Sequence, residues 1–271
     1  MVNILINVLI QIFIFIVSVF VIGFIISLIN RLFYRFVNHN RVVCYATGII
    51  GTPIHELSHA LFCVVFLHKI NEIKFFQIDE ETGVLGYVNH SYNKRNLYQS
   101  AGNFFIGIAP IVCGSIFLFI LMMFLLPDVY ETTQNNFKTF FLIFSQNRYS
   151  YFISAVFDLV SGVFKGIFLH SLVDWKLWVF IVICFCVALH MNLSGADIKE
   201  SLITLPIIIV IIIALNLIFG FTSLYTDFLT VVTSIGCTLI GFSLLSVVFS
   251  LFMLIIGVIV FGFKKVVLKR R

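Results

Sequence analysis

The chain has 271 residues, of which 61% are hydrophobic and only 11% are charged, and its mean hydropathy is +1.13. A soluble domain carries about 25% charged and about 45–50% apolar residues, so this composition excludes a soluble globular protein and predicts a polytopic membrane protein. The formal net charge of +5 comes largely from basic residues at the edges of apolar runs, which favours contacts with lipid headgroups and predicts no nucleic-acid partner.

The apolar runs predict about six transmembrane helices, with five to seven as the range. A helix needs about 20 apolar residues to cross the hydrocarbon core of a bilayer. Suitable runs lie at residues 4–30, 43–68, 101–126, 177–196, 203–222 and 230–263. The last run is longer than one crossing needs, so we expect it to tilt, to extend beyond the bilayer or to break near Gly241. Residues 1–271 would then form a single all-α integral membrane domain.

The first run, residues 4–30, has no basic segment before it and no small-residue cleavage site after it. We therefore expect a retained transmembrane helix rather than a signal peptide. Arg31, Arg35 and Arg41 follow, which predicts a cytoplasmic first loop. Six crossings would place the basic C-terminal sequence KKVVLKRR outside, so the same rule requires one further crossing within 128–176 or one crossing fewer.

The second run holds the sequence HELSH, with ionisable groups at its centre. Such groups at bilayer depth cost roughly 2.5–3.5 kcal/mol each on insertion scales, which favours a functional role. His55 and His59 are four residues apart and project from one face of a helix. Two neutral imidazoles are ligands that Zn²⁺ prefers, and Glu56 is placed to take a proton from a metal-activated water. The motif predicts a zinc site with Glu56 as general base.

Two connecting regions differ from the apolar runs. Residues 70–92 alternate apolar and polar side chains around a central EETG, which predicts a β-hairpin directly after the HELSH helix. That hairpin could be an edge to which an extended substrate adds as a strand, or a covering loop. Residues 128–176 mix Phe and Ile with polar and charged residues, which favours an interfacial helix or a re-entrant segment over a clean crossing.

The helix expected at 101–126 begins with AGNFFIGIAPIVCGS, and its Asn103 has two interpretations. A buried amide could hydrogen-bond a substrate backbone or a developing oxyanion. Alternatively, Gly102, Gly107 and Gly114 indicate close helix packing, in which polar side chains bond across helices. Both interpretations stay open from the sequence.

The segment VALHMNLSGADIKES, residues 187–201, supplies candidates for a third metal ligand. His190, Ser194 and Asp197 are spaced i, i+4 and i+7, so they share one face if the helix continues through them. Asp197 is the preferred third ligand and His190 is the alternative. Asp197 could instead be an interfacial carboxylate paired with Lys199.

Together, HELSH in an apolar helix, a hairpin after it and a later NLSGAD resemble the site-2-protease family of intramembrane zinc metallopeptidases. The resemblance covers roughly residues 43–126 and 177–200, which would form the metallopeptidase-like core. The runs at 4–30, 203–222 and 230–263 would then be accessory helices.

The resemblance implies that His55, His59 and Asp197 are zinc ligands and that Glu56 is the catalytic base. Asn192 resembles the asparagine that precedes the aspartate ligand in that family. Asp197 is followed by isoleucine where the family has glycine, and the proline of the family motif is missing. The implied activity is hydrolysis of a peptide bond within or next to a transmembrane segment of a protein substrate in the membrane lipid.

Three other functions fit parts of the sequence. A non-proteolytic zinc-binding membrane protein, with a structural, sensing or regulatory role, would keep the same ligands. A membrane zinc peptidase of another class would use a glutamate as third ligand, for which Glu200 is the candidate. An ion transporter should carry ionisable residues on several helices, and the runs 4–30 and 203–222 carry none.

The remaining expectations concern cysteine chemistry and location. Six cysteines lie mostly inside apolar runs and form no CxxC pair, so we expect small buried apolar residues rather than disulfides or metal ligands. They are Cys44, Cys63, Cys113, Cys184, Cys186 and Cys237. The absence of organelle signals and the Ile-, Phe- and Asn-rich composition favour a bacterial cell membrane. Nothing in the sequence predicts the oligomeric state.

Overall fold

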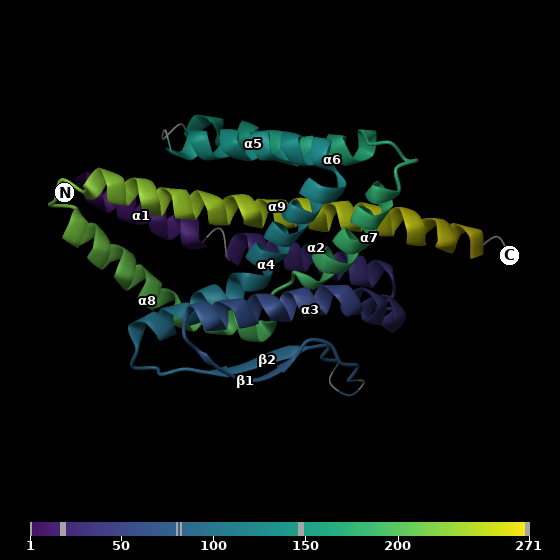
Figure 1. The fold of residues 1–271 in the computed structure, drawn as a ribbon, viewed down its shortest axis with the longest axis horizontal. Helices are drawn as coiled ribbons and strands as arrows, with labels where there is room; N and C mark the ends of the chain where they lie inside the picture. Colours follow the sequence, from purple (N-terminus) through teal and green to yellow (C-terminus); the bar gives the residue numbers. More distant parts are fainter. Residues whose placement is uncertain (1, 17–19, 80, 82, 146–148, 269–271) are drawn as a thin grey trace.

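The computed structural model describes the chain except for residues 1, 17–19, 80, 82, 146–148 and 269–271 (Figure 1). Its helices and strands, in chain order, are α1 (Val2–Ile16), α2 (Ile22–Phe36), α3 (Arg41–Val65), β1 (Lys69–Lys74), β2 (Tyr87–Ser91), α4 (Leu97–Leu125), α5 (Pro127–Ser145), a short 3₁₀ turn (Tyr149–Tyr151), α6 (Phe152–Leu169), α7 (Trp175–His190), α8 (Gly195–Phe219) and α9 (Tyr225–Leu268). The prediction of a mainly helical protein with a hairpin after the HELSH helix is confirmed.

Among the described residues, four helices are long and apolar enough to cross a membrane: α3, α4, α8 and α9 over Tyr225–Val260. These correspond to four of the six expected crossings, and they support a membrane protein. The run at 177–196 forms only the 16-residue α7, because the helix ends at His190. The run at 203–222 belongs to a helix that begins earlier, at Gly195.

Over the run at 4–30 the structure describes α1 and α2, each 15 residues long. The prediction of one helix over 4–30 depends on residues 17–19, which lie outside the described part of the chain, so it stays a prediction. Residues 269–271 of the basic C-terminal sequence also lie outside the described part.

Helix α9 is continuous through Gly241, which excludes a break there and leaves a tilt or an extension beyond the bilayer as the explanations of its length. A Cβ at this position would overlap the ring of Phe137 in α5. The glycine therefore makes room for a neighbouring aromatic side chain, and the helix continues past it.

Residues 128–176 form two helices that pack against each other and against α9. Figure 1 shows α5 and α6 on the opposite side of the molecule from the hairpin. Neither is among the helices long and apolar enough to cross a membrane, within the described residues. The interfacial or re-entrant placement of this region stays a prediction, as does the topology.

The hairpin lies beside α3, which both strands contact. Its antiparallel pairing runs from Lys69 opposite Ser91 to Lys74 opposite Tyr87, with a shift in register after Ile70. The chain can turn from α3 into β1 because Leu67 adopts a left-handed backbone with φ of 57°. This turn brings the hairpin back alongside the helix that carries the two histidines.

Candidate metal centre

Helix α3 approaches α7 closely at Gly51, one turn before His55. A Cβ at Gly51 would overlap the backbone carbonyl of Cys186 and would come within 2.6 Å of the ring of His190. Only a residue without a side chain allows this spacing of the two backbones. The close approach brings the end of α7 within reach of the HELSH side chains.

Two backbone carbonyls set the orientation of the histidine rings. His55 Nδ1 lies 2.6 Å from the carbonyl oxygen of His190, and His59 Nδ1 lies 2.8 Å from that of Ile106. A carbonyl oxygen only accepts hydrogen bonds, so each neutral ring donates its Nδ1–H and keeps a lone pair on Nε2. The two Nε2 atoms lie 3.1 Å apart. Both lone pairs therefore converge on one point, where a cation would be bound by both rings.

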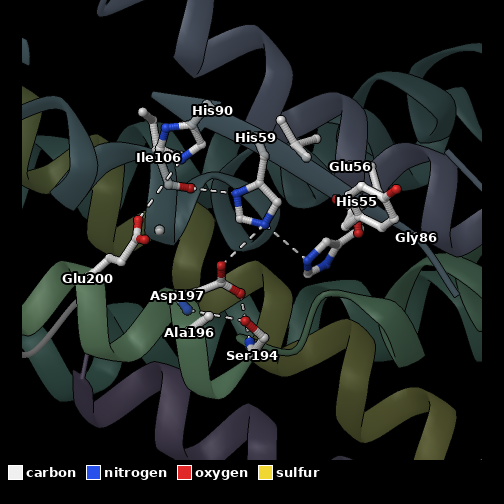
Figure 2. A pocket seen from close by; sticks show the side chains of 13 residues that line it. His55, Glu56, His59, Gly86, His90, Ile106, Ser194, Ala196, Asp197 and Glu200 are labelled. Atoms are coloured by element: carbon white, nitrogen blue, oxygen red, sulfur yellow. Dashed lines mark hydrogen bonds and ion pairs between the residues drawn. The ribbon is translucent and has the colours of Figure 1, made fainter. Parts of the chain in front are cut away.

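Asp197 supplies a carboxylate at the same point. Helix α7 ends at His190, and Ser194 caps the start of α8. The Ser194 N–H donates to Asp197 Oδ2 at 2.7 Å, and the Asp197 N–H donates to Ser194 Oγ at 3.1 Å. This capping box holds one carboxylate oxygen at the helix start. The other oxygen, Oδ1, lies 3.5 Å from His59 Nε2 (Figure 2).

These separations suit tetrahedral zinc. Bonds of 2.0–2.1 Å in tetrahedral geometry place two N or O ligands about 3.3–3.4 Å apart. The nitrogen pair at 3.1 Å and the nitrogen–oxygen pair at 3.5 Å lie on either side of that value. One ligand atom from each of His55, His59 and Asp197 lies within 4.8 Å of the others. The three residues fit a zinc ion that keeps one position for water or substrate.

A cavity of about 210 Å³ opens onto these ligands. Its walls come from α3, the hairpin, α4 and the start of α8, and the lining residues are His55, Glu56, His59, Gly86, Tyr87, Val88, His90, Ile106, Gly107, Ser194, Ala196, Asp197 and Glu200. Glu56 is 6% exposed and packs beside Gly86, where a Cβ would come within 2.9 Å of the Glu56 Cγ. The carboxylate of Glu56 thus shares one cavity with all three candidate ligands.

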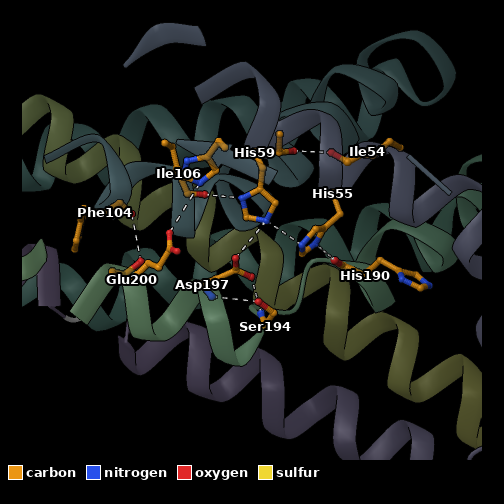
Figure 3. A network of polar contacts seen from close by, with 12 residues as sticks. Ile54, His55, His59, Phe104, Ile106, His190, Ser194, Asp197 and Glu200 are labelled. Atoms are coloured by element: carbon orange, nitrogen blue, oxygen red, sulfur yellow. Dashed lines mark hydrogen bonds and ion pairs between the residues drawn. The ribbon is translucent and has the colours of Figure 1, made fainter. Parts of the chain in front are cut away.

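His190, Ser194 and Asp197 would share one face only if one helix continued through them, and it does not, because α7 ends at His190 and α8 begins at Gly195. The His190 ring lies beside Thr47 and Thr52, with Nε2 3.1 Å from Thr47 Oγ1 and Nδ1 3.4 Å from Thr52 Oγ1. Figure 3 shows this ring pointing away from the other two histidines. The backbone carbonyl of His190, rather than its imidazole, contributes to the site.

Asn103 and Asn192 do not line the cavity. Each has a buried side-chain oxygen without a hydrogen-bond partner among the described residues. Asp197 forms no ion pair with Lys199 in the described part of the chain, whereas it does face His59. The location of Asp197 thus favours the metal-ligand interpretation over the interfacial ion pair.

Sequence reasoning did not place His90 or the two orienting carbonyls at the site. Burial and the neighbouring imidazoles of His68 and His59 lower the pKa of His90 from 6.5 to about 4, so this ring is neutral at pH 7. Glu200, considered above as an alternative ligand, lines the cavity one helical turn after Asp197. The i+3 spacing of Glu200 from Asp197 indicates, from the sequence, that both face the same side of a helix. No such spacing places His90 at the site, because its position depends on how the hairpin folds.

We compared the chain with family models, curated proteins and solved structures. None of them matches. The interpretation of the site therefore rests on the residues and distances given above.

Proposed function

We propose that the chain is an intramembrane zinc-dependent endopeptidase of the site-2-protease type. Its substrate would be a peptide bond within or next to a transmembrane segment of another protein. The observation that supports this most is the convergence of two imidazole lone pairs and one carboxylate oxygen beside Glu56 in a single cavity. The four long apolar helices among the described residues support a membrane location, and we further propose, from the composition, that this is a bacterial cell membrane.

Bound at His55, His59 and Asp197, zinc would act as a Lewis acid toward a water and the scissile carbonyl. Glu56 would accept a proton from the attacking water as the new C–O bond forms. The same carboxyl group would then donate that proton to the amine nitrogen as the C–N bond breaks. Burial of Glu56 beside Gly86 keeps its carboxyl group in the cavity, within the space that the water and the scissile bond would share.

The hairpin supplies one wall of that cavity through Gly86, Tyr87 and Val88. Strand β2 pairs with β1 along one edge only, within the described residues. An extended peptide that adds along the other edge of β2 would pass the candidate ligands in the unwound form that hydrolysis needs. This supports a role for the hairpin in presenting the substrate.

The test uses the purified full chain in lipid nanodiscs and a panel of single-span membrane peptides as probe substrates. Glu56→Gln should keep the zinc content of the parent and lose cleavage by at least about 100-fold, the lower end of general acid–base contributions. His59→Asn should lose both zinc from this site and cleavage. Glu131→Gln, an exposed glutamate of α5, is the matched control and should behave as the parent.

Two results would contradict the proposal. If Glu56→Gln cleaved at the parent rate, Glu56 could not be the general base. The second result is a parent protein that binds zinc but cleaves none of the probes, together with a cellular phenotype that His59→Asn abolishes and Glu56→Gln preserves. This combination would favour a non-proteolytic zinc protein.

A further inference from the structure

A second group of metal-ligating side chains lies at the end of α3. The helix closes with two hydrogen bonds, from the His68 N–H to the Cys63 carbonyl at 2.8 Å and from the Leu67 N–H to the Val64 carbonyl at 3.1 Å. With Leu67 left-handed, this is a Schellman turn, which commonly brings its two end residues into side-chain contact. Apolar residues usually make that contact. Here the two residues are a cysteine and a histidine.

The hairpin adds a third member to this pair. His90 in β2 stands opposite Ile70 in β1, so its ring reaches the end of α3. His68 Nδ1 lies 3.0 Å from His90 Nδ1. One ligand atom from each of Cys63, His68 and His90 lies within 4.8 Å of the others. Cys63 is fully buried and His68 is 6% exposed, whereas His90 is half-buried and lines the cavity described above.

The outer nitrogen of His68 has a hydrogen-bond acceptor, and that of His90 has a carboxylate nearby. His68 Nε2 lies 2.7 Å from the carbonyl oxygen of Gln99, so the neutral ring donates Nε2–H and keeps a lone pair on Nδ1. His90 Nε2 lies 4.0 Å from a carboxylate oxygen of Glu200, which favours a proton on that nitrogen. The Nδ1 lone pair of His90 then faces that of His68. Histidines that bind metals show this pattern, with the outer N–H directed at a carbonyl or carboxylate.

The simplest alternative is a hydrogen bond between the rings. If His90 carried its proton on Nδ1, it could donate to His68 Nδ1 across the 3.0 Å separation. That tautomer would direct the Nε2 lone pair of His90 at the carboxylate of Glu200. It would also leave the nearby thiol of Cys63 without a role. A cation between the rings satisfies both lone pairs and the sulfur together.

We propose that Cys63, His68 and His90 form a second zinc site, separate from the one at HELSH. A thiolate and two imidazoles select zinc over magnesium or calcium, which prefer oxygen ligands. Tetrahedral zinc places sulfur and nitrogen ligands about 3.6 Å apart, so side-chain shifts of about 1 Å would close the group around the ion. A water from the cavity that His90 lines would complete the four ligands.

The position of this site assigns it a structural role. Cys63 lies in the last turn of α3, His68 in the turn that follows it and His90 in β2, so a bound ion would fasten the hairpin to the helix. Residues 86–88, next to His90 in the same strand region, form a wall of the cavity that holds Glu56. The second zinc would thereby hold that wall in position without contacting the substrate.

Cobalt distinguishes the two sites because only the second contains sulfur. The full chain in nanodiscs would be stripped with a chelator and reloaded with Co²⁺ or Zn²⁺. We expect two equivalents of zinc in the parent and a thiolate-to-cobalt charge-transfer band in the near ultraviolet. Cys63→Ser should abolish the band and reduce zinc to one equivalent. Cys44→Ser, a cysteine at the other end of α3, is the matched control and should keep both.

The histidines give an independent comparison. His59→Asn should lose one equivalent of zinc and keep the cobalt–thiolate band, whereas His90→Asn should lose the band. His39→Asn, an exposed histidine with φ of 49°, is the matched control because asparagine tolerates this backbone. The proposals for the two zinc sites can therefore be refuted independently of each other.

A measurement on the parent alone avoids any effect of substitution on folding. X-ray absorption at the zinc edge should show a sulfur neighbour at about 2.3 Å. Absence of that neighbour in zinc-loaded parent, or a cobalt band that persists in Cys63→Ser, would overturn the proposal. In the first case, the ring-to-ring hydrogen bond would explain the contact between His68 and His90.

Discussion

Ser194→Ala tests whether the capping box at the start of α8 prepares Asp197 for metal binding. The substitution removes the hydroxyl that accepts the Asp197 N–H at 3.1 Å. The reciprocal hydrogen bond, from the N–H of residue 194 to Asp197 Oδ2 at 2.7 Å, remains possible. Without the second bond of the capping box, it holds the carboxylate less firmly. The side chain of Ser194 is not one of the proposed ligands, so any loss of affinity acts through the orientation of Asp197.

The size of the effect follows from the cost of losing the cap. Replacing an N-cap serine by alanine costs about 1 kcal/mol, within a range of about 0.5–2 kcal/mol. If the metal-bound state depends on the capped start of α8, the dissociation constant for zinc rises by about fivefold for each 1 kcal/mol. Loss of a group that orients a ligand typically costs 10–100-fold in metal affinity. We therefore expect about a tenfold weaker site, with Ser194→Thr close to the parent.

The assay is a competition titration of zinc against a chromophoric chelator, in a Cys63→Ser background that leaves only the HELSH site. Asn40→Ala is the matched control, since Asn40 caps α3 by accepting the Val42 N–H at 2.9 Å, far from Asp197. Equal zinc affinity in Ser194→Ala and in Asn40→Ala would refute the reasoning. It would mean that Asp197 reaches the metal without help from its cap.

Three further predictions concern residues in the cavity or next to it. Gly86→Ala should lower cleavage at least about tenfold with zinc at the HELSH site unchanged, because a Cβ there comes within 2.9 Å of Glu56 Cγ and of two nearer atoms, Thr52 Cγ2 at 2.7 Å and the Lys74 carbonyl oxygen at 2.8 Å. Gly195→Ala meets open space and should match the parent. His190→Gln should keep zinc in an equilibrium dialysis measurement, since only the backbone carbonyl of that residue contacts the site; loss of the metal would contradict this assignment. Because the pKa of His90 falls from 6.5 to about 4 on folding, the unfolded state binds more protons between these values, so the melting temperature of the metal-free protein should fall as pH drops from 6.5 to 4. His90→Asn should flatten that dependence, and an unchanged slope would show that other groups cause it.

Local patterns in the sequence predict the parts of the site that lie within one element. The spacing of His55 and His59 needs only a helix, and the alternation over 70–92 needs only a hairpin. The sequence predicts Asp197 as third ligand but leaves its place relative to His190 open, since that depends on whether one helix continues through both. The sequence Ser194-Gly-Ala-Asp197 is itself a capping-box pattern, which marks a helix start and could have revealed the break.

The remaining features depend on contacts between elements. Every residue has a carbonyl group, so nothing in the sequence distinguishes those of Ile106 and His190 as the ones that orient the imidazoles. The approach of His90 to Cys63 depends on the register of the strands and on the left-handed Leu67. Such tertiary arrangements have no counterpart in residue spacing.

Helix α3 carries ligands of both proposed metal sites. His59 and Cys63 are four residues apart, which is about 6 Å along the helix axis. A rotation or tilt of this one helix would therefore alter the geometry of both ions together. Any coupling of zinc affinity between the two positions through this helix would be equal in both directions, as thermodynamic reciprocity requires.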